Sequence, residues 1–276
     1  MSPSKRPKPA PLSFRTEVTR RANTLGVKPE DLERALIIGQ IAGLLAKDPA
    51  LKGKIAHKGA AMLHLVNLSQ RLSRDLDTAD IKGQRLDERA VRRALDTAAA
   101  RKVVVRIDKI TARGTDSLSL LVHCRALRGG TTVGITVSIN WSEPFSLKPV
   151  MESYALPDGT PISVPVMDPR ERAAEKVRAF LTRGEAPDAY DLWWYATKVL
   201  KHSELLGLSG LIQTKLGRSR LGSGDVLERF DEMRDNAKAE WTTGKGLVIA
   251  GPKPTWTEVD KALARFKSVT PHRAHP

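Results

Sequence analysis

The sequence is short of cysteine and of long apolar runs, and each shortage excludes a class of protein. Cys124 is the single cysteine, so no intramolecular disulfide can form and a buried core has to hold the fold together. Cys124 lies in an apolar run, which favours a buried side chain over a reactive thiol. No stretch approaches the roughly 20 apolar residues that span a bilayer. Residues 1–13 are basic but lack the apolar stretch of a secretory signal, so we expect a disordered tail and a cytoplasmic protein without membrane contact.

Acidic residues are outnumbered, with 31 Asp and Glu against 46 Lys and Arg and a formal net charge of +15. Such an excess favours a polyanionic partner, because basic side chains that neutralise phosphates release counterions. Nucleic acid is the natural candidate for that partner. An arginine-rich coding bias would give the same charge, since net charge governs solubility and encounter rather than a specific site.

The pattern of apolar residues divides the 276-residue chain into two kinds of structure, as one large or two modest domains. In the first half it predicts helices at 14–25, 29–46 and 87–100 and strands at 103–111, 117–127 and 131–141. Turn signals between these strands favour an antiparallel meander. Gly59 separates a short apolar run from a helix at 60–68, and a further strand is expected around residue 75.

The second half is predicted to be helical beyond a segment of short strands or loops at 149–165. The expected helices are 168–183, 188–203, 204–216, 224–238 and 256–267. The predicted fold class is therefore α+β, an N-terminal mixed sheet with flanking helices followed by a helical C-terminal half. We expect the sheet domain to cover residues 14–166 and the helical domain, which contributes to the functional site, to cover residues 167–276.

Asp75 and Asp77 form an acidic pair with one residue between them. On a strand both carboxylates point to the same face, where they repel each other unless a cation or a proton lies between them. Mg²⁺ prefers oxygen ligands of this kind. An Asp-x-Asp pair alone is more often a solvated turn, so the neighbouring sequence has to decide. Lys58 and Gly59 precede a helix start shortly before the pair, and a glycine there lets the backbone approach a phosphate.

A second cluster of charged residues lies at 171–196. Asp188 and Asp191 are three residues apart on one predicted helix and therefore share a face. Lys176, on the preceding helix, has no acidic residue three or four positions away, so its charge needs an anion from elsewhere in the fold. A bound triphosphate would supply that anion. An ion-paired helix surface is the alternative explanation of this segment.

Together the two segments resemble the AbiEii/AbiGii (MenT-like) toxin family of nucleotidyltransferases, within the polymerase-β-like superfamily. They cover residues 54–80 and 168–196 directly, and the matching motifs occur in the family's order. These motifs are Lys58-Gly59, Arg71-x-Ser73-x-Asp75-Leu76-Asp77, Glu175-Lys176-x-x-Ala179 and Asp188-Ala189-Tyr190-Asp191-Leu192.

The resemblance implies a nucleotidyltransferase-like fold and an enzyme that uses Mg²⁺ to transfer a nucleotidyl group, expected to be a pyrimidine, from a nucleoside triphosphate (NTP) to RNA. Pyrophosphate would leave, and the expected acceptor is the 3′ end of tRNA. The chain would then be the toxin of a toxin–antitoxin system that blocks translation and is restrained by a cognate antitoxin protein. The implied catalytic residues are Asp75, Asp77, Lys176 and Asp191, of which Asp75 and Asp77 would bind the metal. The implied nucleotide-binding residues are Lys58, Gly59, Ala60, Arg71 and Ser73.

Three departures separate this sequence from the family pattern. Ala60 and Ala61 stand where the family has a small residue and a hydroxyl residue, which leaves only backbone N–H groups for a phosphate. No third metal-binding carboxylate is evident, because Ser138 and Asn140 occupy the polar face of the later strand. Pro187 replaces the arginine that precedes the last acidic motif.

Two other functions are compatible with the same scaffold. A catalytically weak or inactive protein could act as a nucleic-acid-binding or regulatory module. The four ordered motifs favour the enzyme, because a carboxylate pair carries a repulsion that only a metal or a proton relieves. An antibiotic-adenylylating enzyme would need an acidic pocket for a cationic drug, and the basic chain argues against it.

Overall fold

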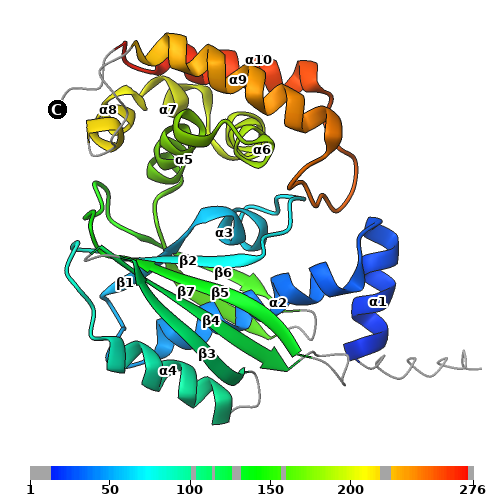
Figure 1. The fold of residues 1–276 in the computed structure, drawn as a ribbon, viewed down its shortest axis with the longest axis vertical. Helices are drawn as coiled ribbons and strands as arrows, with labels where there is room; N and C mark the ends of the chain where they lie inside the picture. The colour runs from blue at the N-terminus through cyan, green and yellow to red at the C-terminus, as the bar shows by residue number, and fades with distance from the viewer. Residues whose placement is uncertain are drawn as a thin grey trace, which may run out of the picture.

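The computed structural model describes residues 14–100, 104–113, 116–125, 132–156, 160–217 and 225–272. The first half of the chain forms a mixed seven-stranded sheet with flanking helices, and the second half is helical (Figure 1). This confirms the expected α+β class. The expected tail, residues 1–13, lies outside the described residues. No described helix is both long and apolar enough to cross a membrane.

The elements follow the predicted order closely. The first half contains α1 (Phe14–Leu25), α2 (Pro29–Lys47), β1 (Ile55–Lys58), α3 (Gly59–Leu65), β2 (Asp75–Asp80), α4 (Glu88–Ala100), β3 (Val104–Arg113), β4 (Ser117–Arg125), β5 (Thr132–Asn140), β6 (Val150–Ala155) and β7 (Pro161–Val166). The second half contains α5 (Pro169–Arg183), α6 (Ala186–Trp194), a π-helical turn (Tyr195–Val199), α7 (His202–Leu206), α8 (Ser209–Gly217), α9 (Val226–Thr243) and α10 (Trp256–Val269).

The strand order is β3-β4-β5-β2-β1-β7-β6, so β1 and β2 lie inside the sheet. The meander β3-β4-β5 is antiparallel as expected, whereas β2 pairs in parallel with β5, and β1 pairs in parallel with β7. The register places Lys58 opposite Asp77, and Asp77 beside Ser138. The acidic pair is therefore held by hydrogen-bonded strands on both sides rather than by a loop.

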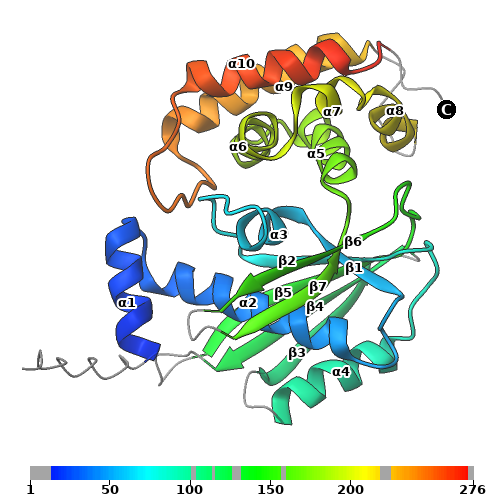
Figure 2. The same ribbon diagram turned by 180° about the vertical axis from the view of Figure 1, so that it is seen from behind.

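Each half of the chain has its own large hydrophobic core. In both ribbon views α2 and α4 lie on the side of the sheet away from the helical half, while α3 lies between the sheet and the helical half (Figures 1 and 2). The helix α3 also packs against α2, where Leu65 lies beside Gly39. On β5 the alternating side chains of Val133, Ile135, Val137 and Ile139 are buried in the sheet core, as the alternation predicts. The helical core includes Leu63 of α3, whose neighbour Met62 belongs to the sheet core. The helix α3 is thus shared by both cores.

Four predicted helices differ from the structure. The expected helix 188–203 is α6 followed by the π-helical turn, which ends at Val199 because Leu200 is extended. The helix α3 ends at Leu65 rather than at 68, and Leu68 has φ +57°, a left-handed backbone that ends helices. The expected helix 204–216 is divided into α7 and α8 at Gly207, a residue with low helix propensity. The helix α9 continues to Thr243, where Gly244 adopts the left-handed cap conformation.

Cys124 is fully buried, as expected from its apolar run. Burial disfavours the thiolate and raises the pKa of Cys124 to about 12. A thiol that stays protonated at neutral pH is a weak nucleophile, so this cysteine is a packing residue.

Candidate active site

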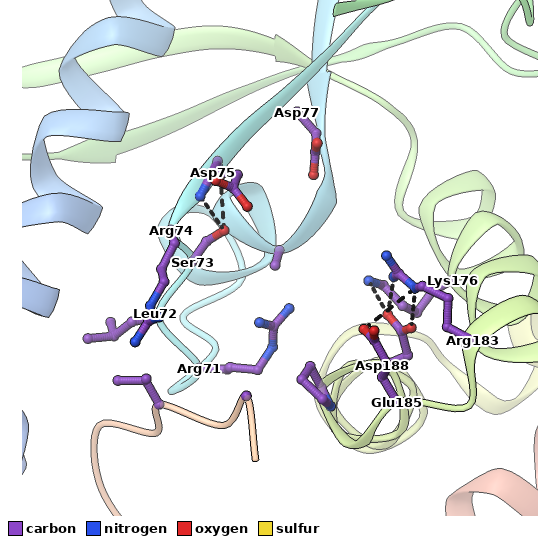
Figure 3. Close-up of a pocket in the computed structure, with 14 residues that line it drawn as sticks. Arg71, Leu72, Ser73, Arg74, Asp75, Asp77, Lys176, Arg183, Glu185 and Asp188 are labelled. Carbon is purple, nitrogen blue, oxygen red and sulfur yellow. Dashed lines mark hydrogen bonds and ion pairs between the residues drawn. The ribbon is translucent and has the colours of Figure 1, made fainter. Parts of the chain in front are cut away.

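Asp75 and Asp77 lie at the start of β2 and face the helical half (Figure 3). The side chain of Leu76 between them is buried in the sheet core, so the two carboxylates share the opposite face. Asp75 is exposed and Asp77 is half-buried. Both line a cavity of about 330 Å³, here called the central cavity, which also includes Arg71, Ser73 and Lys176.

Gly59 and Asp77 are packed so closely that only glycine fits. Gly59 has φ +73°, in the left-handed region, and a Cβ atom at this position would collide with the Asp77 carboxylate. Burial raises the pKa of Asp77, while the nearby Lys58 and Lys176 act in the opposite direction. The sequence predicted that a phosphate approaches the backbone at Gly59, but the space beside Gly59 is occupied by the Asp77 carboxylate.

The carboxylate pair suits a divalent cation. Two hard oxygen ligands lie on one face, and a bound cation would relieve both their mutual repulsion and the burial that raises the pKa of Asp77. The hydroxyl of Ser73 donates to the Asp75 backbone carbonyl at 3.0 Å, which holds the turn into β2. In the described part of the chain no cluster of three or more His, Cys, Asp or Glu side chains is suited to hold a metal. A cation here would complete its coordination with phosphate oxygens or water.

Lys176 has partners within the fold. Its Nζ lies 3.0 Å from Asp188 Oδ1 and 3.0 Å from Asp191 Oδ2, both on α6. The inference that Lys176 needs a ligand to balance its charge is therefore wrong, whereas its contact with a triphosphate stays a prediction. The helical spacing described only α5 itself, whereas α6 packs against α5 and brings two carboxylates to the lysine.

Arg71 and Arg183 also bind these two carboxylates, which gives a network of five charged groups with Lys176, Asp188 and Asp191. Arg71 donates two hydrogen bonds of 2.7 Å to the two oxygens of Asp191. Arg183 Nη2 lies 2.8 Å from Asp188 Oδ1. Burial opposes ionisation of Asp191, but Arg71 and Lys176 outweigh it and lower its pKa. Arg183 Nε also lies 3.6 Å from Glu185 Oε2, so a third carboxylate adjoins these five groups and balances the three cations.

Asp191 differs from the other candidate residues in its position. It is completely buried behind Arg71 and Lys176 and does not line the central cavity. Ala60, Arg71, Ser73, Asp75, Asp77 and Lys176 do line it, and Lys58 and Gly59 line an adjoining cavity of about 190 Å³. The structure therefore gathers the predicted residues in one place, but Asp191 reaches a ligand only through its partners.

Residues that the sequence did not single out complete the surroundings of Lys58. Lys58 Nζ lies 2.8 Å from Glu175 Oε2, and the fully buried Lys215 of α8 lies 2.6 Å from Glu171 and 3.4 Å from Glu175. Burial alone would raise the pKa of Glu175, but Lys58 and Lys215 hold it at about 2. Lys215 follows Leu211 and Ile212 on its helix, and a lysine among apolar residues was the available signal.

A third cavity, of about 480 Å³, is bordered by Asp75, Asp77 and residues of β4 and β5. Ser117, Ser119, Thr136 and Ser138 of β4 and β5 line it with hydroxyl groups. Asp77 and Arg183 line all three cavities. A ligand bound in any of the three cavities would therefore lie beside Asp77.

Solved structures share this fold at low sequence identity. JHP933 from Helicobacter pylori is similar with a TM-score of 0.60 and 12% identity, covering 88% of this chain and 92% of that chain. MenT4, a nucleotidyltransferase toxin from Mycobacterium tuberculosis H37Rv, is similar with a TM-score of 0.54 and 16% identity, covering 92% of this chain and 99% of that chain. No curated protein sequence matches the chain.

A family model that matches most of the chain defines the class of the protein as a nucleotidyltransferase. Within that class, the chain belongs to the family described as nucleotidyl transferase AbiEii toxin, Type IV TA system, whose model matches residues 43–265. The matched range contains every residue of the carboxylate pair and of the two ionic networks. The resemblance inferred from the motifs is confirmed.

Proposed function

We propose that the protein is a Mg²⁺-dependent toxin that transfers a nucleotidyl group, from a pyrimidine NTP, to RNA. The acceptor in this proposal is the 3′ end of tRNA, and its modification blocks translation. The carrying observation is the central cavity, in which Asp75 and Asp77 of the sheet face Lys176 of the helical half. Carboxylates that suit a metal and a cation that suits a phosphate thus line one cavity.

In the proposed reaction, the 3′-hydroxyl oxygen of RNA attacks the α-phosphorus of the NTP. A new phosphorus–oxygen bond forms, the bond to the bridging α–β oxygen breaks, and pyrophosphate leaves with the electron pair, while water takes up the hydroxyl proton. When bound, Mg²⁺ offsets negative charge on the phosphate oxygens. Asp75 and Asp77 would hold that ion, and their position on a central strand keeps them in register.

Lys176 binds the triphosphate in this proposal. Two of its three N–H groups point to Asp188 and Asp191, so one remains for a phosphate oxygen. Asp188 and Asp191 fix the ammonium group in place, and Arg71 in turn holds Asp191. Asp191 is then a positioning residue rather than a group that touches the substrate. Lys58, Gly59, Ala60 and Ser73 line the remaining walls around the phosphates.

The cavity over β4 and β5 suits the acceptor. Its hydroxyl side chains, Ser117, Ser119, Thr136 and Ser138, can donate to and accept from ribose hydroxyls. Because Asp75 and Asp77 line both cavities, an acceptor hydroxyl there would lie close to a nucleotide in the central cavity. The net charge of +15 would favour the approach of RNA. The matched family implies an antitoxin partner, and the proposal sets the reaction in the cytoplasm, where NTPs and tRNA occur.

The test is incubation of the protein with total RNA, Mg²⁺ and each of the four α-labelled NTPs in turn. We expect label from a pyrimidine nucleotide in RNA of tRNA size, and none with Asp77→Asn or after chelation. Label in a different size class would refute tRNA as the acceptor. Binding of RNA without any label would instead support the non-catalytic module.

A further inference from the structure

Arg172 of α5 is buried without a hydrogen-bond partner. It is 3% exposed, and none of its three guanidinium nitrogens finds a partner in the described part of the chain. The guanidinium carbon lies 6.0 Å from the centroid of the Tyr195 ring. Asp168 acts on Arg172 electrostatically but forms no hydrogen bond with its guanidinium, so this side chain lacks the directly bonded anion that a buried charge needs.

Arg172 lines the cavity of about 190 Å³, here called the α5 cavity. Five basic side chains line it, Lys58, Arg172, Lys176, Arg178 and Arg183. Only Asp77 and Glu175 are acidic. The two neighbouring cavities are lined by basic and acidic side chains in equal numbers. The α5 cavity is therefore the one of these three that carries an excess of positive charge.

The excess positive charge belongs to Arg172 and Arg178 of α5. Lys58 is neutralised by Glu175, which stays ionised because its pKa is held at about 2. Lys176 and Arg183 are engaged by carboxylates of α6. Arg178, half-buried, also has a buried Nε without a hydrogen-bond partner among the described residues. Glu175 interacts electrostatically with Arg178 but is already paired with Lys58, so Arg172 and Arg178 carry the charge that a bound anion would balance.

We propose that the α5 cavity is a phosphate-binding site, with Arg172 as its buried anchor and Arg178 beside it. The planar guanidinium fork matches two phosphate oxygens and is the preferred buried cation for such groups. A phosphate there lies next to Asp77, within the same set of connected cavities. Only the source of the phosphate rests on the proposed function: it is either the polyphosphate tail of the donor or a phosphodiester of the acceptor RNA.

The direct test is calorimetric titration of the full chain with inorganic pyrophosphate in the presence of EDTA, so that no metal bridges the ligand. We expect Arg172→Gln to weaken binding at least tenfold and Arg178→Gln at least threefold. Arg170→Gln is the matched control, because Arg170 lies on the same helix but outside the three cavities, and should change affinity less than twofold. Equal losses in Arg172→Gln and Arg170→Gln, or no binding to the folded wild type, would overturn the site.

Thermal unfolding separates loss of the ligand from loss of the fold. Ligand-free Arg172→Gln should melt at the wild-type temperature or above it, because an unpartnered buried charge has been removed. Pyrophosphate should raise the melting temperature of the wild type and leave that of the variant unchanged. An equal rise in both proteins contradicts the proposal.

Competition experiments identify the source of the phosphate. Displacement of labelled NTP, but not of labelled RNA, by pyrophosphate assigns the site to the donor, and the reverse assigns it to the acceptor. Displacement of neither contradicts the site. Binding that depends on Arg172 in a wild-type protein without transfer activity would refute the proposed function alone, whereas transfer with binding independent of Arg172 would refute the site alone.

Discussion

At the scale of single residues, Asp77 occupies a position where an ionised carboxylate is disfavoured. Burial raises its pKa, Asp75 adds like-charge repulsion, and the neighbouring Gly59 leaves room for the carboxylate only because it lacks a Cβ atom. A protein that keeps such a group accepts a loss of stability in its metal-free state, which is typical of functional residues.

The corresponding prediction concerns Asp77→Asn. We expect the variant to lose all detectable transfer and to gain roughly 1 kcal/mol of unfolding free energy without metal, because the charge and its desolvation are removed. Asp75→Asn, at an exposed position, should lose activity with little change in stability. Urea unfolding and the labelled-nucleotide assay measure both effects. A less stable variant with wild-type turnover would contradict the prediction.

Lys176 is expected to affect both folding and activity. Lys176→Ala leaves Asp188 and Asp191 buried with fewer cations, so we expect a loss of about 3–5 kcal/mol of unfolding free energy. Turnover should fall far more in Lys176→Ala than in Lys176→Arg, since arginine restores the charge but misplaces it. Steady-state kinetics and denaturant unfolding on the same preparations provide the test. Unchanged kcat, KM and stability would show that Lys176 is dispensable.

At the scale of elements, His57 joins three of them beneath the site. Its Nδ1 accepts from Thr78 Oγ1 of β2 at 2.9 Å, and its Nε2 donates to the Ala42 carbonyl of α2 at 3.0 Å. Burial disfavours the imidazolium and lowers the pKa of His57 to about 4. This histidine is a structural residue of β1, not a metal ligand.

The position of His57 predicts a loss of stability in mild acid. An unfolded chain takes up this proton below its ordinary pKa near 6.5, whereas the folded chain resists until about 4, so unfolding binds a proton in that window. Stability should therefore fall with pH between 6.5 and 4, by up to roughly 3 kcal/mol from this group. His57→Gln should be less stable at pH 7 but lose less stability on acidification. Parallel pH profiles for both proteins would contradict this account.

At the scale of the whole molecule, the site exists only where the two halves meet. Backbone hydrogen bonds from Leu72 to Val248 (2.9 Å) and from Ala250 to Gln70 (2.7 Å) tie the segment after α9 to the segment before β2. The bidentate pair of Arg71 and Asp191 spans the same junction. Residues 14–166 and 167–276 remain our proposal for the two domains.

The net charge of +15 predicts that RNA binding weakens steeply with salt. If about six phosphates are contacted, affinity should fall roughly 10³-fold between 50 and 200 mM salt. The reason is that the release of counterions gains less entropy when the surrounding salt is more concentrated. A fluorescence titration with labelled tRNA measures this slope. Asp75→Asn is the control, since it removes activity but none of the basic side chains, and it should keep the slope. An affinity for tRNA that does not change with salt would mean that the basic side chains do not contact RNA phosphates.

The sequence by itself determined the local geometry of the site. Strand alternation places Asp75 and Asp77 on one face, and helical spacing places Asp188 and Asp191 on another, because both depend only on backbone periodicity. The same periodicity predicted nearly all the helices and strands. The order of the motifs is read directly from the sequence. Periodicity missed the ends of α3 and the division between α7 and α8, where a single backbone conformation or a glycine interrupts a helix.

Only the tertiary structure decided which charges meet. Lys58 pairs with Glu175 across 117 residues of sequence, and Arg71 pairs with Asp191 across 120. Periodicity tells which face of a helix is buried but not which side chain it packs against, since that depends on how the helices dock on the sheet. For the same reason the sequence could not distinguish Lys176, which finds two carboxylates, from Arg172, which finds none.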